Sequence, residues 1–249
     1  MALRPRDYLR VSGPDAEGFL QRMLSNDIAL APCEALLLTP KGRIIAPLVV
    51  VRRAADDFLL LTEPGLGDAV RATLLRARFA SKVEIEAEEH RSTVVLGADG
   101  GIPNRDYGVA ASEHLDAKLE PTLNGDELER MRIEAGAPAW GKELDDSILP
   151  AEAGLDQRAI SFTKGCYPGQ EPIARLRHRG KVNRTLRVLD VGDAAPGDEL
   201  VYDGKVVGRV TSAVPGRALA YVRVEVPADA ELEVGASGTA AKTVRAAGA

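Results

Sequence analysis

The sequence predicts an α+β fold followed by a smaller C-terminal region of short β-strands, either a β-barrel or a sandwich. In the N-terminal part, strand and helix signals alternate. Residues 35–38 and 44–51 flank the turn-like run Thr39-Pro40-Lys41-Gly42, as the antiparallel strands of a hairpin would, which disfavours a doubly wound parallel sheet. After Arg184 the sequence pattern changes, and short segments typical of strands recur between Gly and Pro residues.

The N-terminal elements follow from the spacing of apolar residues. Residues 8–11 alternate weakly and predict a strand, and Gly13-Pro14 then opens a helix that ends near Ser25-Asn26-Asp27. The apolar face of this helix consists of Ala16, Phe19, Leu20, Met23 and Leu24. A second amphipathic helix carries Leu66, Val70, Leu74 and Ala77. Further strands are predicted at residues 57–62, 83–85 and 93–96.

The second half of the chain has weaker signals at first. Residues 98–121 show no regular pattern, and no element is predicted there. A third helix begins near Asn124 and ends at Gly136. Beyond it, Asp203-Gly204 is a strong hairpin turn signal. C-terminal strands are predicted at residues 186–191, 199–202, 206–214 and 218–226.

The bulk composition narrows the function classes. The chain has 249 residues and a formal net charge of −5, whereas general nucleic-acid binders are usually basic. The longest apolar run, residues 44–51, is too short to cross a bilayer, and the N-terminus lacks the apolar core of a signal peptide. We therefore expect a cytoplasmic protein that binds neither membranes nor, directly, nucleic acids.

The two cysteines, Cys33 and Cys166, are too few for a disulfide framework or an iron–sulfur cluster held by this chain alone. With three histidines and no Cys-x-x-Cys pair, no metal site is expected. The sequence also lacks a phosphate-binding glycine motif and a Gly-x-Ser-x-Gly elbow. Nucleotide-driven chemistry and serine hydrolysis are therefore disfavoured.

Cys166 is the strongest candidate for chemistry. Gly165 and Gly169 flank it and allow unusual backbone conformations or the close approach of a ligand. Lys164 supplies an ammonium that would favour the reactive thiolate, and Pro168-Gly169 predicts a tight turn just after the thiol. A buried structural cysteine in a tight loop is an equally strong interpretation at this point. Cys33 lacks such a setting, and we interpret it as structural.

A basic run follows this segment within an acidic chain. Its members are Arg175, Arg177, His178, Arg179, Lys181 and Arg184. Such a run is most often a solvated face, but it would also suit an anionic ligand or RNA phosphates. No aromatic residue interrupts residues 177–181, so stacking on single-stranded RNA gains little support, whereas arginine suits carboxylates.

The run Lys164-Gly165-Cys166-Tyr167-Pro168-Gly169-Gln170-Glu171 resembles the signature Lys-Gly-Cys-(Tyr/Phe)-x-Gly-Gln-Glu of the YgfZ family. These are folate-binding proteins related to the T-protein, the aminomethyltransferase of the glycine cleavage system. Residues 20–27, 37–43 and 160–162 are similar to the family as well, as are Arg179-Gly180-Lys181 and Arg184. The resemblance covers essentially the whole chain and is thinnest at residues 98–121.

The resemblance implies a T-protein-like body of ferredoxin-like units around a folate cavity, plus a C-terminal β-barrel. We place the body at residues 1–183 and the barrel at residues 184–249. It also implies tetrahydrofolate as ligand, and a role in assembling or repairing iron–sulfur clusters in client enzymes, including a radical enzyme that modifies tRNA. Iron–sulfur client enzymes or assembly factors are the expected partners.

For the site, the resemblance implies that Cys166 is functional, within a motif that includes Lys164, Gly165, Tyr167, Gly169, Gln170 and Glu171. Asn26, Asp27 and Arg179 are the candidates for contacts to folate. A folate-dependent aminomethyltransferase or demethylase of the T-protein type is the main alternative, although an accessory factor fits a signature cysteine better. A third interpretation is a non-catalytic scaffold in which the motif is a structural turn.

Overall fold

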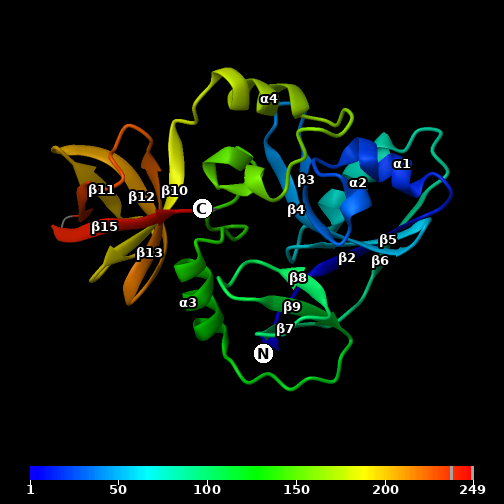
Figure 1. The fold of residues 1–249 in the computed structure, drawn as a ribbon, viewed down its shortest axis with the longest axis horizontal. Coiled ribbons are helices and arrows are strands. Elements are labelled where there is room, and N and C mark those ends of the chain that lie inside the picture. Colours follow the sequence, from blue (N-terminus) through cyan, green and yellow to red (C-terminus); the bar gives the residue numbers. More distant parts are fainter. Residues whose placement is uncertain (236–237, 248–249) are drawn as a thin grey trace. The chain divides into compact units, whose positions relative to one another are not determined.

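The protein was analysed as a computed structural model that describes residues 1–235 and 238–247, apart from the side chain of Arg179. The chain forms two compact units, which we call unit 1 and unit 2 (Figure 1). Unit 1 comprises Met1–Asn104, Ala111–Thr122 and Asp156–Arg179, and unit 2 comprises Arg105–Ala110, Leu123–Leu155 and Gly180–Ala249. The expected domain boundary between residues 183 and 184 stays a prediction.

Unit 1 contains a five-stranded antiparallel sheet. The strands lie in the order β3-β4-β5-β2-β6, with bounds β2 Asp7–Ser12, β3 Cys33–Leu38, β4 Ile44–Ala54, β5 Asp57–Thr62 and β6 Glu84–Glu88. The predicted hairpin is present: β3 pairs with β4, and Leu37 lies opposite Ala46. Along β4, buried positions alternate with half-buried ones from Ile44 to Val51, which is the period of a strand.

Two helices cover one face of this sheet, as Figure 1 shows: α1 (Ala16–Met23) and α2 (Gly67–Ala77). Phe19 and Leu20 of α1 share one apolar core with Val70 and Leu74 of α2 and with the inward-facing side chains of the sheet. Both helices were predicted from this apolar spacing, and both are confirmed.

The opposite face of the sheet packs against a second, four-stranded sheet of order β1-β7-β9-β8. Its strands are β1 Ala2–Leu3, β7 Ser92–Leu96, β8 Ile102–Asn104 and β9 Ala111–Leu115. β8 and β9 lie within residues 98–121, where the sequence predicted no element. β8 is only three residues long, and β9 buries Glu113, which Arg6 neutralises through an ion pair. Because a charged residue occupies a buried position in β9, the sequence there does not show the alternation of apolar and polar residues that predicts a strand.

Unit 2 holds α3 (Gly125–Ala135) and a closed six-stranded barrel. The Asn124 and Glu127 side chains cap α3 reciprocally, and Gly136, with φ +69°, ends it. The barrel strands are β10 Arg184–Val191, β11 Glu199–Tyr202, β12 Lys205–Val214, β13 Gly216–Arg223, β14 Glu231–Val234 and β15 Thr239–Ala246. The predicted C-terminal β-barrel is confirmed, although β14 and β15 were not predicted.

A buried polar cluster in unit 2 joins α3 to the barrel. Arg132 pairs with Glu143 at 2.8 Å, Ser212 Oγ donates to Glu143 at 2.6 Å, and the Tyr221 hydroxyl donates to the Glu143 carbonyl at 2.9 Å. The Glu143 side chain has no exposed surface. Since every member is hydrogen-bonded, we interpret the cluster as structural.

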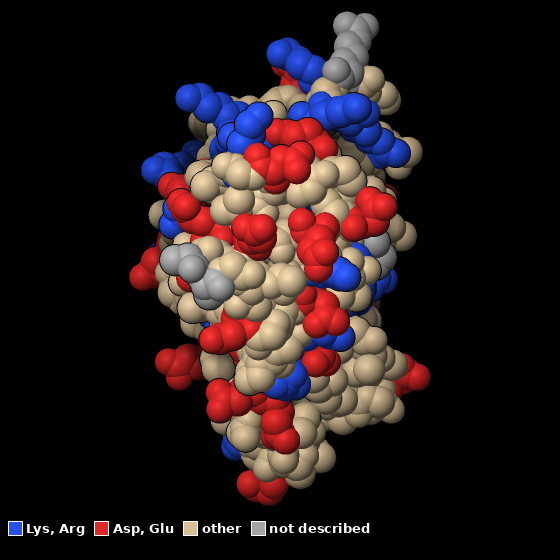
Figure 2. Space-filling view, turned by 90° about the vertical axis from the view of Figure 1, so that its left-hand side faces the viewer, with Lys and Arg blue, Asp and Glu red and all other residues tan. Residues whose placement is uncertain are grey.

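The helices and one face of the surface test the expectation that this chain binds neither membranes nor nucleic acids. In the part of the chain that the structure describes, none of the helices combines the length and the apolar character needed to cross a membrane. On the face drawn in Figure 2, acidic side chains are spread widely, and basic side chains gather at the upper edge. The mixed charge of this face gives no continuous basic track for a phosphate backbone.

Candidate functional site

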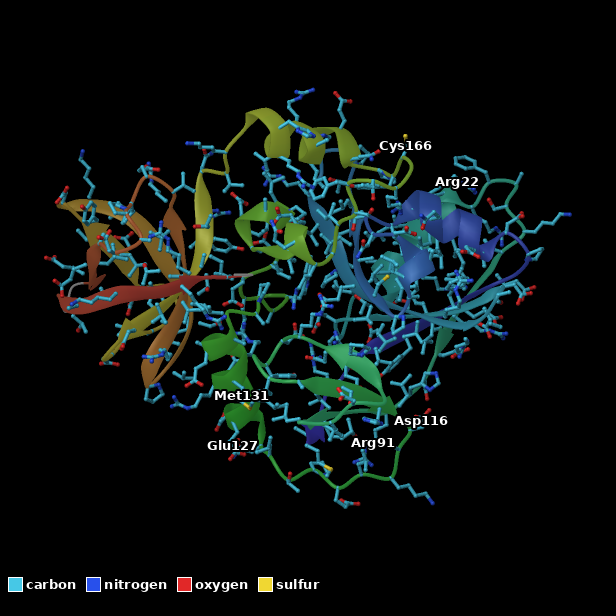
Figure 3. All side chains as sticks on the ribbon, in the orientation of Figure 1. Arg22, Arg91, Asp116, Glu127, Met131 and Cys166 are labelled. Carbon is cyan, nitrogen blue, oxygen red and sulfur yellow. The ribbon has the colours of Figure 1, made fainter. Side chains whose placement is uncertain are left out.

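The residues of the predicted motif lie on one loop and the helix that follows it, between the short 3-10 helix η3 (Leu155–Gln157) and α4 (Gln170–Arg179). We call residues 161–169 the Cys166 loop. Cys166 is a free, exposed thiol, and its side chain points outward from the ribbon (Figure 3). This position excludes the interpretation of Cys166 as a buried structural cysteine.

Gly169 determines how the Cys166 loop passes the turn between β3 and β4. Its φ of +83° is a left-handed conformation that glycine adopts freely. A Cβ atom at this position would lie 2.6 Å from the Thr39 carbonyl oxygen and 3.0 Å from Gly42 Cα, so two backbone turns are in direct contact. Gly165 is different, because a Cβ atom there would meet nothing within 4 Å. Close packing therefore requires glycine at Gly169, whereas a Cβ atom at Gly165 would lie in open space.

Lys164 ties the Cys166 loop to the end of α1. Its ammonium donates hydrogen bonds to the carbonyl oxygens of Leu24 and Asn26, both at 2.7 Å. The last carbonyls of a helix lack partners within the helix and favour a cation. Burial lowers the pKa of Lys164 to about 8. The sequence argument used this ammonium to activate Cys166, but the structure directs its hydrogen bonds to the turn after α1.

Asn26 and Asp27 form that turn. Asn26 Nδ2 donates to the carbonyl oxygens of Glu34, at 2.6 Å, and Arg158, at 3.2 Å, and Asn26 Oδ1 accepts from the Asp27 backbone N–H. Asp27 Oδ1 accepts from the Ala29 N–H at 3.1 Å and from the Gln21 side chain at 3.0 Å. The structure thus brings Asn26, Asp27 and Lys164 together at one end of α1.

The other motif side chains have distinct environments. Tyr167 is buried, with its ring centre 5.5 Å from Lys164 Nζ, and burial raises the pKa of its hydroxyl to about 12. Gln170 is the first residue of α4, and Glu171 follows it, pairing with Arg175 at 2.8 Å on an exposed surface. Tyr167 therefore packs the loop in place, while an acidic residue in the first turn of α4 is favoured by the helix dipole.

The basic run does not form one patch on one unit. α4 carries Arg175, which pairs with Glu171, and Arg177, whose guanidinium lies 3.7 Å from the centre of the Phe162 ring. Arg184 belongs to unit 2, where it pairs with Glu152 at 3.3 Å. The side chain of Arg179 lies outside the described part of the chain, so its candidate role as a folate contact stays a prediction.

Cys33 begins β3 and is half-buried. Its thiol donates to the Asp27 carbonyl oxygen at 3.7 Å, and burial raises its pKa to about 11. At neutral pH the thiol therefore stays protonated and is a poor nucleophile. These observations agree with the structural interpretation of Cys33.

Sequence reasoning did not find the residues that hold the chain just before the Cys166 loop. Ser25 Oγ donates to the Ala159 carbonyl at 2.6 Å and accepts from the Leu36 N–H at 2.8 Å. Arg158 pairs with Glu34 at 2.9 Å. Ser25 lies in a run already similar to the family, so that resemblance was the available signal, whereas backbone carbonyl acceptors leave no mark in a sequence.

Within the described residues, no three His, Cys, Asp or Glu side chains gather closely enough to hold a metal ion. The Cys166 loop offers an exposed thiol, an ordered backbone and a partly buried ammonium.

Comparisons with known proteins relate this arrangement to a family. Residues 183–247 match the family described as CAF17, C-terminal beta-barrel domain. The tRNA-modifying protein YgfZ of Edwardsiella ictaluri is 29% identical, over 74% of this chain and 69% of its own length. An iron-sulfur cluster assembly factor IBA57 homolog, mitochondrial, from Pyricularia oryzae is 27% identical, over 93% of this chain and 73% of its own length.

A solved structure shows the same fold. It is the glycine cleavage system aminomethyltransferase T from Bartonella henselae, with a TM-score of 0.82 at 20% identity, covering 96% of this chain and 82% of that one. This likeness confirms the predicted T-protein-like fold. The barrel match and the similarity to YgfZ and IBA57 proteins agree with it. The chain is thus similar to YgfZ and IBA57 proteins over most of its length, and it shares the fold of the T-protein.

Proposed function

We propose that this protein is a tetrahydrofolate-binding accessory factor for the assembly or repair of iron–sulfur clusters in client enzymes, with Cys166 as its functional thiol. The observation that carries the proposal is the exposed Cys166 on a loop that Gly169 and Lys164 hold in place. Relatives named as a tRNA-modifying protein and as an iron-sulfur cluster assembly factor support it.

In this proposal, Cys166 acts as a thiolate in transient contact with a cluster, a sulfur species or a one-carbon adduct. The open space at Gly165, which precedes Cys166 in the chain, would admit that group, and the buried Tyr167 packs the loop in place. Gln170 and Glu171 form the start of α4 directly after the loop. Lys164 is a positioning residue, since its ammonium contacts the α1 turn.

The candidate folate residues fit the ligand to different degrees. All polar side-chain atoms of Asn26 are engaged in the turn, so Asn26 suits a supporting role. In the described structure Asp27 uses Oδ1 for its hydrogen bonds, which leaves Oδ2 able to accept from an N–H group of a pterin. Arg179 is proposed to pair with a folate carboxylate, a contact that arginine forms well.

The main alternative is a folate-dependent aminomethyltransferase or demethylase, which the T-protein-like fold favours. Turnover of aminomethylated lipoyl protein with tetrahydrofolate would support it. We expect no turnover, with tetrahydrofolate binding intact in wild type and in Cys166→Ser when titrated by calorimetry under anaerobic conditions. If wild type fails to bind tetrahydrofolate, the folate part of the proposal is wrong, and the scaffold interpretation gains support.

The accessory function itself is tested in bacterial cells that lack their own YgfZ-type protein. We expect the chain to restore the methylthiolated tRNA nucleosides made by an iron–sulfur radical enzyme, measured by mass spectrometry of digested tRNA. The clients and assembly factors would be contacted directly, without nucleic-acid binding by this chain. We also propose a cytoplasmic location, because the YgfZ relatives are bacterial. Unchanged nucleoside levels would count against the accessory function.

A further inference from the structure

The loop after α2 presents an aromatic side chain to solvent. Phe79 is 91% exposed, and no other large apolar side chain among the described residues is more exposed. Its φ is +44°, a left-handed conformation that is rare and unfavourable for a bulky residue. The fold therefore displays this ring at a cost in both backbone conformation and hydration.

The Phe79 loop is held in place on both sides. The Ser81 N–H donates to the Arg78 carbonyl at 2.9 Å, and the Lys82 N–H donates to Asp15 Oδ2 at 2.8 Å. From α1, the Arg22 guanidinium donates to Ser81 Oγ at 3.3 Å. Since these contacts fix the backbone around Phe79, its exposure is a property of an ordered loop.

A cavity of about 590 Å³ opens beside Phe79, between this loop and α1. Pro14, Phe19 and Met23 supply apolar lining, and the charged lining residues are Arg22, Arg78 and Asp15. This open hollow has both apolar and charged lining, a combination that can take one apolar side chain flanked by charged groups.

Four exposed cations surround this position: Arg22, Arg76, Arg78 and Lys82. In the described part of the chain, none of the four is paired with a carboxylate. By contrast, two arginines on β4 have acidic partners: Arg52 pairs with Glu17, and Arg53 with Glu88 and Asp57. The segment from Arg76 to Lys82, together with Arg22, thus carries four cations without a carboxylate partner, and Asp15 is the acidic residue beside them.

We propose that Phe79 and these four cations, here called the Phe79 surface, dock an acidic segment of a partner protein that inserts an apolar side chain into the adjoining cavity. Buried aromatic anchors and arginines dominate protein–protein recognition, and complementary charge adds specificity. A single-stranded nucleic acid would need several successive stacking platforms, and the Phe79 surface offers one exposed ring.

The Phe79 surface adjoins the Cys166 loop through α1. The last turn of α1 carries Arg22, which contacts Ser81, and ends in the carbonyl of Leu24, which Lys164 binds. A partner docked at Phe79 would therefore lie near the loop that presents the thiol. The docking itself does not depend on the chemistry of Cys166, so it can be measured separately.

The test uses fluorescein-labelled synthetic peptides of about twelve residues, rich in Asp and Glu, with Leu, Ile or Phe at the centre. Matched peptides carry Ser at the centre, or Lys in place of the acids. Anisotropy titrations compare wild type with Phe79→Gly, with Arg22→Gln/Arg78→Gln, and with Lys205→Gln, a control that removes one positive charge from the barrel. Because glycine relieves the positive φ, Phe79→Gly should not lower the melting temperature.

We expect saturable binding of acidic peptides with an apolar centre, weakened about tenfold or more by Phe79→Gly and by the double arginine variant but not by Lys205→Gln. The matched peptides, with Ser at the centre or Lys in place of the acids, should bind wild type no more tightly than the acidic apolar peptides bind these variants. The proposal is overturned if no acidic peptide binds, if Phe79→Gly binds as wild type does, or if an RNA oligonucleotide binds in a Phe79-dependent manner. A dimer in sedimentation that Phe79→Gly abolishes would assign the surface to a second copy and also overturn it.

Discussion

The two cysteines of unit 1, Cys33 and Cys166, differ in exposure and in their relation to Lys164. Cys33 is half-buried at the start of β3, bound to the Asp27 carbonyl, with a pKa raised by burial to about 11. Cys166 is exposed at the tip of a loop whose backbone is fixed by Gly169. The Lys164 ammonium contacts the turn beside Cys33, although Lys164 is two residues from Cys166 in the chain.

This difference shows that the closeness of Lys164 to Cys166 in the sequence does not reveal which groups the Lys164 ammonium contacts. A partly buried ammonium must satisfy its donors, and the carbonyls after α1 are the acceptors that it reaches. Lys164 therefore stabilises the position of the Cys166 loop. Cys166 differs from Cys33 in its exposure, which a substrate needs, and in the open space at the neighbouring Gly165.

The largest expected effect concerns thiol reactivity. With iodoacetamide at pH 8, Cys166 should react about 100-fold faster than Cys33 or more, since burial keeps Cys33 protonated and shielded. Mass spectrometry of digested protein at timed intervals gives both rates in one sample. Cys166→Ser should leave only the slow phase. Comparable alkylation rates of Cys166 and Cys33 would contradict the conclusion that only Cys166 is accessible and reactive.

A second prediction separates the two motif glycines. Gly169→Ala should lower the free energy of unfolding by about 1–3 kcal/mol, because its φ is positive and the added Cβ would meet the Thr39 carbonyl. Gly165→Ala is the matched control and should change stability by less than about 0.5 kcal/mol, since nothing lies within 4 Å. Urea denaturation measures both. Equal losses would show that the loop does not depend on the contact between the two turns.

A third prediction tests Lys164 through pH. Burial lowers the pKa of Lys164 from 10.5 to about 8 in the folded protein, so between these values the unfolded chain binds more protons. Stability from this group should therefore rise with pH across that window, by at most about 1.4 kcal/mol per unit. Denaturation of Cys33→Ser and Cys33→Ser/Lys164→Met at pH 8 to 10 gives the difference. Parallel pH profiles would contradict the burial of this ammonium.

Much of the fold could be predicted because its elements carry strong apolar periods. α1, α2 and the β3–β4 hairpin follow from residues that now form one core. α4 was not predicted, since Ile173 is its one fully buried apolar residue among several cations, and Pro172 obscures its start. β14 has four residues, and β15 alternates small and polar side chains, so neither resembles an isolated strand signal.

The site was predictable in part. The tight turn at Gly169 follows from Pro168-Gly169, and the structure adds the contact with Thr39 that requires it. The exposure of Cys166 could not be derived, because a glycine-flanked cysteine fits a buried turn equally well. The hydrogen bonds of Lys164 were also beyond reach, since their acceptors are backbone carbonyls far away in the sequence. Long-range contacts of this kind depend on tertiary packing.

The most direct test of the central claim compares the two cysteines in cells that lack their own YgfZ-type protein. Wild type, Cys166→Ser and Cys33→Ser are expressed at levels matched by immunoblot, and methylthiolated tRNA nucleosides are measured by mass spectrometry. The account predicts that wild type and Cys33→Ser restore these nucleosides, while Cys166→Ser does not. Full restoration by Cys166→Ser would contradict the assignment of Cys166 as the functional thiol.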